Sequence, residues 1–326
     1  MTLRALHDVP APAKLNLFLH VVGRRADGYH LLESLFVLVD WADRLHFERR
    51  EDGRLLRHDL RSPESLPAAT AALPPDDLCI RAARALAQAS GTTLGADIHL
   101  DKRVPAGAGM GGGSSDAAST LLALNRLWGL NWPRERLAAL GLALGADVPF
   151  FVHGENALVE GIGERLRPAV VPSRRYAVVK PEASLGTAEV FGHPALVRDS
   201  VRLGESARAA ILAGSFEGFE GFGRNDLQPV AEDRCSEVAE AARWLARRFG
   251  ASRMTGSGSA VFSTLPPEAV SQAVARGFSA SGALGPPAAM PGPAAAAPQG
   301  LPDLPTGWVG RLCQGLARHP LADWAR

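Results

Sequence analysis

The stretch Pro105-Ala-Gly-Ala-Gly-Met-Gly-Gly-Gly-Ser-Ser-Asp-Ala-Ala118 leads from a predicted strand into a helical pattern. Glycine has no Cβ, so it adopts positive φ readily and lets backbone N–H groups approach an anion closely. Ser114 or Ser115 is expected to cap the helix, whose N-terminus attracts phosphate through its dipole and free N–H groups. The stretch therefore predicts a phosphate-binding loop. Its glycines are Gly107, Gly109, Gly111, Gly112 and Gly113.

Other readings of this loop fit less well. A glycine run before a helix also occurs in flexible surface loops, but the strand before it and the two serines after it favour phosphate binding. Gly107, Gly109 and Gly112 match G-x-G-x-x-G, yet no acidic residue ends a second strand about 20 residues later, as a dinucleotide fold requires. The Walker A lysine is absent, as are the H-R-D and D-F-G signatures of protein kinases. The loop belongs to another phosphate-binding class.

Composition sets broad limits on the protein. The 326 residues are enough for two domains or one large one, and 46% of them are hydrophobic. A formal net charge of +1 gives no field that would attract nucleic acid or an anionic membrane. Cys79, Cys235 and Cys313 are isolated, which argues against a disulfide framework or a structural zinc site. Without a signal-like or membrane-spanning apolar run, we expect a cytoplasmic protein.

The pattern of the first half predicts strands, then helices around the glycine stretch. Residues 13–22 alternate as a strand with Lys14 and Asn16 on one face. An irregular excursion is expected over 52–75, with a short strand near Leu55. The other expected strands cover 34–39, 44–49, 97–101 and 157–160, and the expected helices end at Ala89, Trp128 and Leu144.

The second half alternates between strands and helices, as in a two-layer α+β domain. A Pro/Ala/Gly segment at 279–305 has too few large apolar residues to order itself, so we expect a flexible insertion. The predicted strands cover 176–180 and 260–265, and the predicted helices cover 187–191, 206–213, 236–249 and 267–276.

Two kinds of charged residue stand out. Only Lys14, Lys102 and Lys180 among 35 basic residues are lysines, so a lysine here indicates a need for a compact point charge. Asp147, in Gly145-Ala-Asp-Val-Pro149, precedes a buried apolar run. An Asp beside Gly commonly satisfies turn amides, but beside a phosphate loop it is also a candidate for chemistry.

Three separated stretches together resemble the GHMP kinases, the superfamily of galactokinase, homoserine kinase and mevalonate kinase. They are Pro12-Ala-Lys-Leu-Asn-Leu17, the loop at 105–118, and Thr255-Gly-Ser-Gly-Ser-Ala-Val-Phe262. Further motifs are similar to the branch that phosphorylates a cytidine diphosphate conjugate of methylerythritol in non-mevalonate isoprenoid biosynthesis. These motifs are Arg25-Ala-Asp-Gly-Tyr-His30, Leu144-Gly-Ala-Asp-Val-Pro149 and Arg224-Asn-Asp-Leu227.

The resemblance implies an α+β architecture of two domains. Residues 1–160 would form the N-terminal ATP-binding domain with a left-handed βαβ unit. Residues 161–326 would form a ferredoxin-like C-terminal domain carrying the 279–305 insertion, with the substrate in the cleft between them. It also implies a small-molecule substrate, without nucleic acid or membrane, and a monomer or weak homodimer.

The resemblance also implies roles for individual residues. Asp147 would take the proton of the substrate's C2 hydroxyl, and Lys14 would stabilise the charge on Asp147 or on the attacking oxygen. ATP implies Mg²⁺, for which Ser115 offers a hydroxyl while the sequence assigns no acidic partner. The implied ATP-binding residues are Lys102, Pro105, Gly107, Gly109, Gly111, Gly112, Gly113, Ser114 and Ser115. The implied substrate-binding residues are Asn16, Tyr29, His30, Phe36, Thr187 and Phe191.

This sequence departs from the family pattern at two places. Gly186 and Ala188 stand where the pattern prefers prolines, and Asp77 replaces an asparagine. An ionised carboxylate only accepts hydrogen bonds, so Asp77 puts an adenine contact there in question. Two alternatives remain open: another small-alcohol GHMP kinase, and a nucleotide-binding relative without catalysis. The Tyr29-His30 pair argues against the first, and retention of Lys14 and Asp147 argues against the second.

Overall fold

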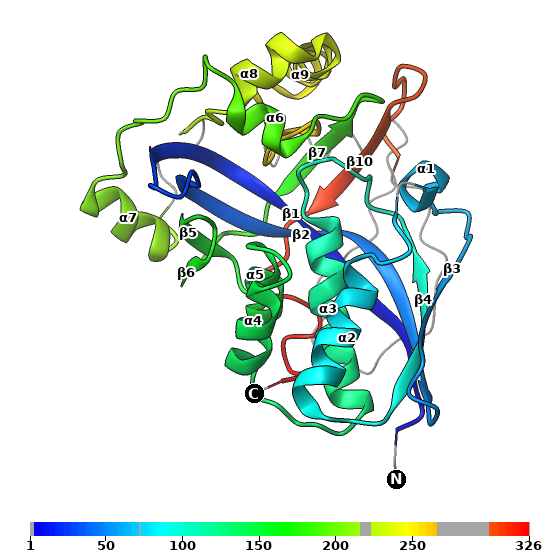
Figure 1. The fold of residues 1–326 in the computed structure, drawn as a ribbon. Helices are drawn as coiled ribbons and strands as arrows, with labels where there is room; N and C mark the ends of the chain where they lie inside the picture. Colours follow the sequence, from blue (N-terminus) through cyan, green and yellow to red (C-terminus); the bar gives the residue numbers. More distant parts are fainter. Residues whose placement is uncertain (1–2, 72, 216–222, 266–299, 326) are drawn as a thin grey trace.

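The computed structural model describes residues 3–71, 73–215, 223–265 and 300–325. The predicted helix at 267–276 and residues 279–299 of the expected insertion lie outside these ranges. The described chain forms two β-sheets with helices on their outer faces (Figure 1). Among its helices, none is long and apolar enough to cross a membrane.

The first sheet has the strand order β3-β4-β2-β5-β6, and β1 pairs along the other edge of β2. β2 is antiparallel to β5 in its first half and to β4 in its second half, whereas β3 and β4 are parallel. The short strand expected near Leu55 is therefore confirmed. The strands are β1 (Ala5–Arg24), β2 (His30–Arg50), β3 (Leu55–Asp59), β4 (Gly95–Asp101), β5 (Ala157–Gly161) and β6 (Arg165–Pro168).

The two strands predicted at 34–39 and 44–49 are one continuous strand, β2, so this prediction was wrong. Polar residues interrupt the apolar pattern at Asp40 and Asp43, but both carboxylates are satisfied. Asp40 accepts a hydrogen bond from the Gln314 backbone, and Asp43 accepts from the Arg103 and Val104 backbone. β2 therefore stays one strand through this stretch, although its register with β1 shifts between Leu38 and Ala42.

Helices cover one face of the first sheet. α2 begins after Asp77, whose side chain accepts from the Ile80 backbone, and it ends before Gly91, which is in the left-handed conformation. α2, α3 and α5 share one apolar core with β2 and β4. The helices are α1 (Pro67–Ala71), α2 (Leu78–Ser90), α3 (Gly112–Leu127), α4 (Arg134–Leu142) and α5 (Val148–His153).

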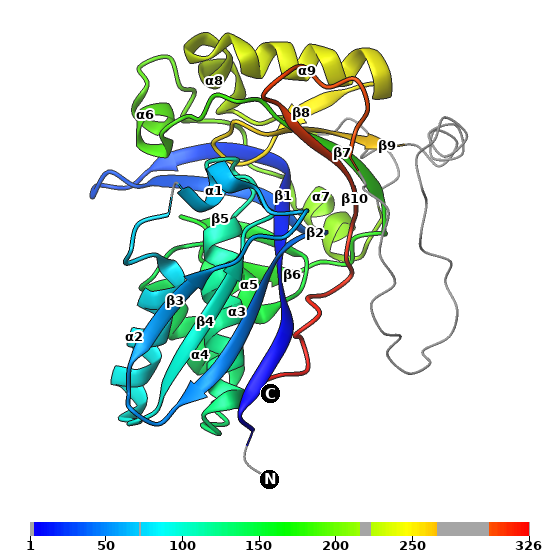
Figure 2. The same ribbon diagram turned by 90° about the vertical axis from the view of Figure 1, so that its right-hand side faces the viewer.

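The second sheet has the order β10-β7-β9-β8, with every neighbouring pair antiparallel. In β7, alternate residues face opposite sides: Tyr176 and Val178 pack with β1 and β2, while Ala177 and Val179 join the core under α9. Figure 2 shows α8 and α9 on the outer face of this sheet. Its strands are β7 (Arg175–Lys180), β8 (Ser252–Met254), β9 (Val261–Leu265) and β10 (Val309–Gln314). The helices are α6 (Thr187–Gly192), α7 (Glu205–Leu212), α8 (Gln228–Arg234) and α9 (Ser236–Phe249).

The C-terminal residues return to the core of the first sheet. Leu321 and Ala325 are buried in that core, and the His319 backbone donates to the Gly154 carbonyl at 2.7 Å, at the end of α5. Arg134 donates to the Ala322 and Ala325 carbonyls. Leu6 and Val9 of β1 pack in the same core, so both ends of the described chain contribute to it.

Candidate active site

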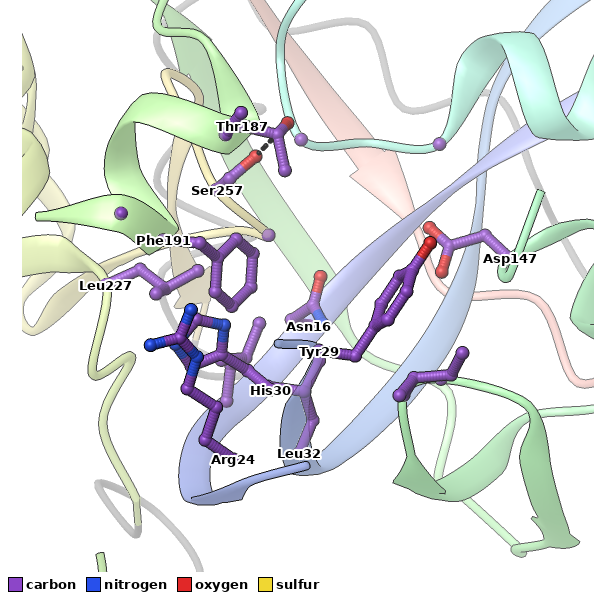
Figure 3. A pocket seen from close by; sticks show the side chains of 18 of the residues that line it. Asn16, Arg24, Tyr29, His30, Leu32, Asp147, Thr187, Phe191, Leu227 and Ser257 are labelled. Atoms are coloured by element: carbon purple, nitrogen blue, oxygen red, sulfur yellow. Dashed lines mark hydrogen bonds between the residues drawn. The ribbon is translucent and has the colours of Figure 1, made fainter. Parts of the chain in front are cut away.

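A pocket of about 710 Å³ brings together residues from the first sheet, from the glycine stretch, from α6 and from the turn at 255–260. Lys14 from β1, Gly109 and Gly111 line it together with Asp147, which lies directly before α5. Figure 3 shows His30, Phe191 and Arg24 at one end, Asp147 at the other, and Asn16 between them. A volume of this size suits an extended small molecule. We call the part near Asp147 the phosphate end and the part near His30 and Phe191 the base end.

The glycine stretch forms a tight loop that ends at the N-terminus of α3. Gly107, Gly109 and Gly111 have φ of 61°, 72° and 71°, which side-chain-bearing residues rarely adopt. The expected cap at Ser114 or Ser115 was wrong: α3 begins at Gly112 and is capped by Gly111 without a side-chain hydrogen bond. The helix N-terminus therefore lies closer to the glycines than predicted, which is the arrangement that binds phosphate through backbone N–H groups.

The glycine loop packs backbone against backbone on the turn at 255–260. Ser259 and Ala260 donate to the carbonyls of Gly107 and Ala108, both at 3.1 Å. A Cβ on Gly109 would lie 2.2 Å from the Thr255 carbonyl oxygen. These two motifs therefore hold each other in place, and this contact requires glycine at 109.

Lys14 and Asp147 meet at the phosphate end, with 3.7 Å between Lys14 Nζ and Asp147 Oδ2. Lys14 is 3% exposed, and its backbone N–H donates to the Met110 carbonyl of the glycine loop. Burial lowers the pKa of the Lys14 ammonium, and the charge of Asp147 opposes part of this shift. The pair places an amine and a carboxylate beside the glycine loop, and the roles expected for them in phosphoryl transfer stay a prediction.

Asn16 and Phe36, which were predicted to contact the substrate, are both buried in the structure. Asn16 Oδ1 accepts from Lys14 Nζ at 2.5 Å, and its Nδ2 donates to Ser34. The Phe36 ring is 4% exposed, packs edge-on against Phe150, and lies 4.6 Å below Lys14 Nζ. Both residues line the pocket and support Lys14, and their contact with a substrate stays a prediction.

Tyr29, His30, Thr187 and Phe191 line the rest of the pocket. Tyr29 is 60% exposed at the turn before β2. The His30 and Phe191 rings lie 5.1 Å apart at 35°. The Thr187 and Ser257 hydroxyls are hydrogen-bonded at 2.9 Å, so α6 and the 255–260 turn meet at the pocket wall.

The remaining predicted ATP residues lie under or beside the loop. Lys102 is buried and bonds Asp43 and Asp116; burial acts to lower its pKa, but the two acids outweigh this and raise it. The Ser115 hydroxyl donates to the Pro12 carbonyl at 2.7 Å and is buried. Pro105 is buried, and Ser114 lies in the first turn of α3.

Several residues of the site were missed from the sequence. Asp43 and Asp116 neutralise Lys102, Thr255 bonds both Asn16 and the glycine loop, and Arg198 donates to His30. Asp116 directly follows Ser114-Ser115, so its proximity to the loop was visible. Nothing in the local pattern around Asp43 or Arg198 indicates a partner more than 50 residues away in the chain.

The glycine loop on a helix N-terminus, the Lys14–Asp147 pair and the two-sheet architecture define a kinase of the GHMP class. Residues 77–155 match the family described as GHMP kinases N terminal domain, and residues 207–284 match GHMP kinases C terminal. The crystal structure of a homoserine kinase from Cytophaga hutchinsonii shares the fold, with a TM-score of 0.60 at 17% identity over 84% of this chain and 90% of that one.

More similar relatives narrow the family. The chain is 57% identical to a 4-diphosphocytidyl-2-C-methyl-D-erythritol kinase of Methylibium petroleiphilum, with 100% of both chains covered. It is 50% identical to the kinase of the same name in Paracidovorax citrulli, over 99% of each chain. A crystal structure of 4-(cytidine 5′-diphospho)-2C-methyl-D-erythritol kinase aligns with a TM-score of 0.67 at 36% identity, covering 82% of this chain and 93% of that one.

The chain therefore belongs to the 4-diphosphocytidyl-2-C-methyl-D-erythritol kinase family, and it is an ATP-dependent kinase. The resemblance predicted from its motifs is confirmed.

Proposed function

We propose that this kinase transfers the γ-phosphoryl group of ATP to the C2 hydroxyl of 4-diphosphocytidyl-2-C-methyl-D-erythritol, giving the 2-phosphate and ADP. The observation that carries the proposal is one pocket with two chemically distinct ends. The phosphate end has the glycine loop and the Lys14–Asp147 pair, and the base end has His30 and Phe191. The Methylibium petroleiphilum and Paracidovorax citrulli relatives bear the name of this activity.

The proposed reaction is a direct transfer. The C2 oxygen forms a bond to the γ-phosphorus while the bond from that phosphorus to the β,γ-bridging oxygen breaks, and the hydroxyl proton passes to the Asp147 carboxylate. Lys14 stabilises negative charge on the attacking oxygen as a compact cation 3.7 Å from that carboxylate. The protein mainly aligns the reactants and stabilises charge, because phosphoryl transfer demands little covalent work from side chains.

The base end is proposed to recognise cytosine. Phe191 and the exposed Tyr29 offer aromatic surfaces for stacking, and His30 offers a hydrogen bond to the edge of the base. Asn16 is proposed to act mainly through Lys14, since its amide oxygen accepts from Nζ. Thr187 borders the pocket where α6 meets the 255–260 turn.

ATP is the co-substrate, and Mg²⁺ is proposed to arrive with its phosphates, to which it binds while keeping several waters. The described residues form no all-protein cage for the ion. Within the described ranges, no group of three or more His, Cys, Asp or Glu side chains is arranged to hold a metal. The Ser115 hydroxyl is committed to the Pro12 carbonyl.

The finer architecture is also proposed. The order β10-β7-β9-β8, which is 4-1-3-2 in chain order, supports a ferredoxin-like second domain. The parallel pair β3 and β4 with α2 between them supports the βαβ unit, which we infer to be left-handed from family membership.

We further propose a domain boundary at 160/161, a cytoplasmic location, and a monomer or weak homodimer. Fractionation and analytical ultracentrifugation test the last two.

The function is tested by incubating the purified protein with ATP and Mg²⁺ and each of four acceptors: the cytidine diphosphate conjugate, mevalonate, homoserine and galactose. ADP release and ³¹P NMR of the product report transfer and its position. We expect the conjugate alone to be phosphorylated efficiently. Preference for another acceptor would overturn the proposal in favour of another small-alcohol kinase, and ATP binding without transfer would favour a non-catalytic relative.

A further inference from the structure

Arg198 joins several parts of the base end. Its Nε donates to His30 Nε2 at 3.1 Å. Its other nitrogens donate to the carbonyls of Leu196, Phe191 and His193 at 3.0, 3.2 and 2.8 Å. One side chain thus holds His30 and the backbone of α6 together, directly beside the His30 and Phe191 rings, which contact each other and both line the pocket.

The contact between Arg198 and His30 decides where the imidazole carries its proton. A guanidinium has only donors, so the ring nitrogen that it meets must be an acceptor. In a neutral imidazole one nitrogen carries the proton and the other accepts. Because Nε2 accepts from Arg198, Nδ1 carries the proton and is the polar group that His30 has left for a ligand.

The neutral form of His30 is favoured by its surroundings. Burial, then the cationic charges of Arg198 and Arg24, lower the pKa of His30. Both arginines line the pocket with it. A second proton on the ring would lie against the Arg198 donor, so the ring stays a single-donor group at neutral pH.

We propose that Arg198 is a positioning residue that fixes His30 as a hydrogen-bond donor at Nδ1 and thereby makes the base end selective for cytosine over uracil. This inference rests on the proposed function, because it assumes a pyrimidine at the base end. N3 of cytosine is an acceptor, whereas N3 of uracil carries a hydrogen. A fixed donor therefore satisfies cytosine and leaves two donors facing each other with uracil.

The tautomer is measured without substrate. Long-range ¹H–¹⁵N spectra of the full-length protein distinguish the two neutral imidazole tautomers, and loss of the His30 signals in His30→Gln assigns them. We expect the Nδ1–H form in the parent and in Arg24→Met, and a mixture of the two forms in Arg198→Met. Arg24 is the matched control because it also places a cation near His30 but donates its Nε to the Gly28 carbonyl. The Nε2–H form in the parent would overturn the proposal.

Selectivity is measured as the ratio of kcat/KM for the cytidine diphosphate conjugate and its uridine analogue. We expect Arg198→Met to lower this ratio about tenfold, the effect of one hydrogen bond, mainly through KM for the cytidine conjugate. Arg198→Lys keeps a cationic donor and is expected to retain part of the selectivity. Equal ratios in Arg198→Met and the parent would contradict the proposal.

A double-mutant cycle separates this role from simple support of α6. In the His30→Gln background, Arg198→Met is expected to leave the ratio unchanged, because glutamine has no imidazole whose tautomer Arg198 could fix. A purely structural Arg198 would lower the ratio equally in both backgrounds, which contradicts the proposal. If the parent phosphorylates neither conjugate, the proposed function fails, while the tautomer spectra still show whether Arg198 sets the state of His30.

Discussion

The two ends of the pocket are built by different means. At the phosphate end, the glycine loop rests on the 255–260 turn through backbone contacts, and Lys14 is 3% exposed. At the base end, Tyr29 is 60% exposed, and His30 is held by the side chain of Arg198. The phosphate end is thus held in place mainly by backbone contacts, and the base end mainly by side-chain contacts. Substitutions should therefore change kcat and stability at the first, and KM and selectivity at the second.

The largest effect is expected for Asp147→Asn at the phosphate end. The amide keeps the shape of the side chain but cannot take the hydroxyl proton, so kcat should fall by about 10²–10⁴-fold. KM for ATP and for the acceptor should change little, because the glycine loop and the base end are untouched. Steady-state kinetics with both substrates measures this.

Asp27→Asn is the matched control, since Asp27 lines the same pocket on the exposed turn before β2. Its kcat should stay within about threefold of the parent, because a surface ion pair contributes about 0–1 kcal/mol. If Asp147→Asn retained the parent kcat, Asp147 would not be the base. The phosphate end would then no longer be distinguished from the base end by its effect on kcat.

The second-largest effect is expected for Gly109→Ala, which disturbs the backbone contact between the glycine loop and the 255–260 turn. Gly109→Ala places a Cβ 2.2 Å from the Thr255 carbonyl oxygen, at a residue whose φ is 72°. The glycine loop and the 255–260 turn must then separate, and the free energy of unfolding should fall by on the order of 3 kcal/mol. Chemical denaturation measures this, and ATP binding should weaken in parallel.

Gly129→Ala serves as the control because Gly129 has a similar φ of 68° but nothing within 4 Å of an added Cβ. It should lose only the conformational cost of about 1 kcal/mol. Equal losses in both variants would mean that strain, and not the contact with Thr255, makes glycine necessary at 109.

The phosphate end was largely readable from the sequence because its function depends on local chain properties. Glycines that allow positive φ, a helix that follows directly, and Lys14 on an alternating strand are all visible within short windows. Errors there were small: α3 starts at Gly112 instead of after a serine cap. The glycines themselves end the loop, since Gly111 in the left-handed conformation can cap a helix without a side chain.

The supports of the site were not readable, because they join distant parts of the chain. Arg198 and His30 are 168 residues apart, and Asn16 and Thr255 are 239 apart. The break between the two strands predicted in β2 has the same origin. Asp43 looks like a surface residue in the sequence, yet it is fully buried because Lys102 bonds it, 59 residues later. A buried polar residue looks exposed until its partner is known.

Acid should loosen the layer behind the phosphate end. His319 packs against Gly154 at the end of α5, and its Nδ1 accepts from the Leu321 backbone at 3.0 Å. Burial, with the charge of Arg134, lowers the pKa of His319 to about 3 from 6.5. Between these two values the unfolded chain binds more protons, so stability rises with pH across this window and is lost as pH falls through it.

At pH 4.5 this residue alone should cost about 3 kcal/mol of the free energy of unfolding relative to pH 7.5. His319→Asn keeps an acceptor for the Leu321 N–H but does not titrate, so its loss over the same range should be smaller by that amount. Denaturant melts at both pH values measure the difference. An identical pH dependence in the variant and the parent would remove His319 as the cause.

The smallest effect is expected at the base end, for Phe191→Leu. The Phe191 ring faces His30 at 5.1 Å and lies on α6, outside the backbone contacts of the glycine loop. Loss of an aromatic face costs about 1 kcal/mol, so KM for the cytidine conjugate should rise about fivefold while kcat stays within about twofold.

Phe249→Leu is the control, because that ring packs near Trp244 at the end of α9 and does not line the pocket. A fall in kcat for Phe191→Leu as large as the rise in KM would mean that stacking also aligns the C2 hydroxyl, since an interaction that acts only in binding cannot change the rate of the bound complex. The two ends would then be coupled through the substrate despite their different construction.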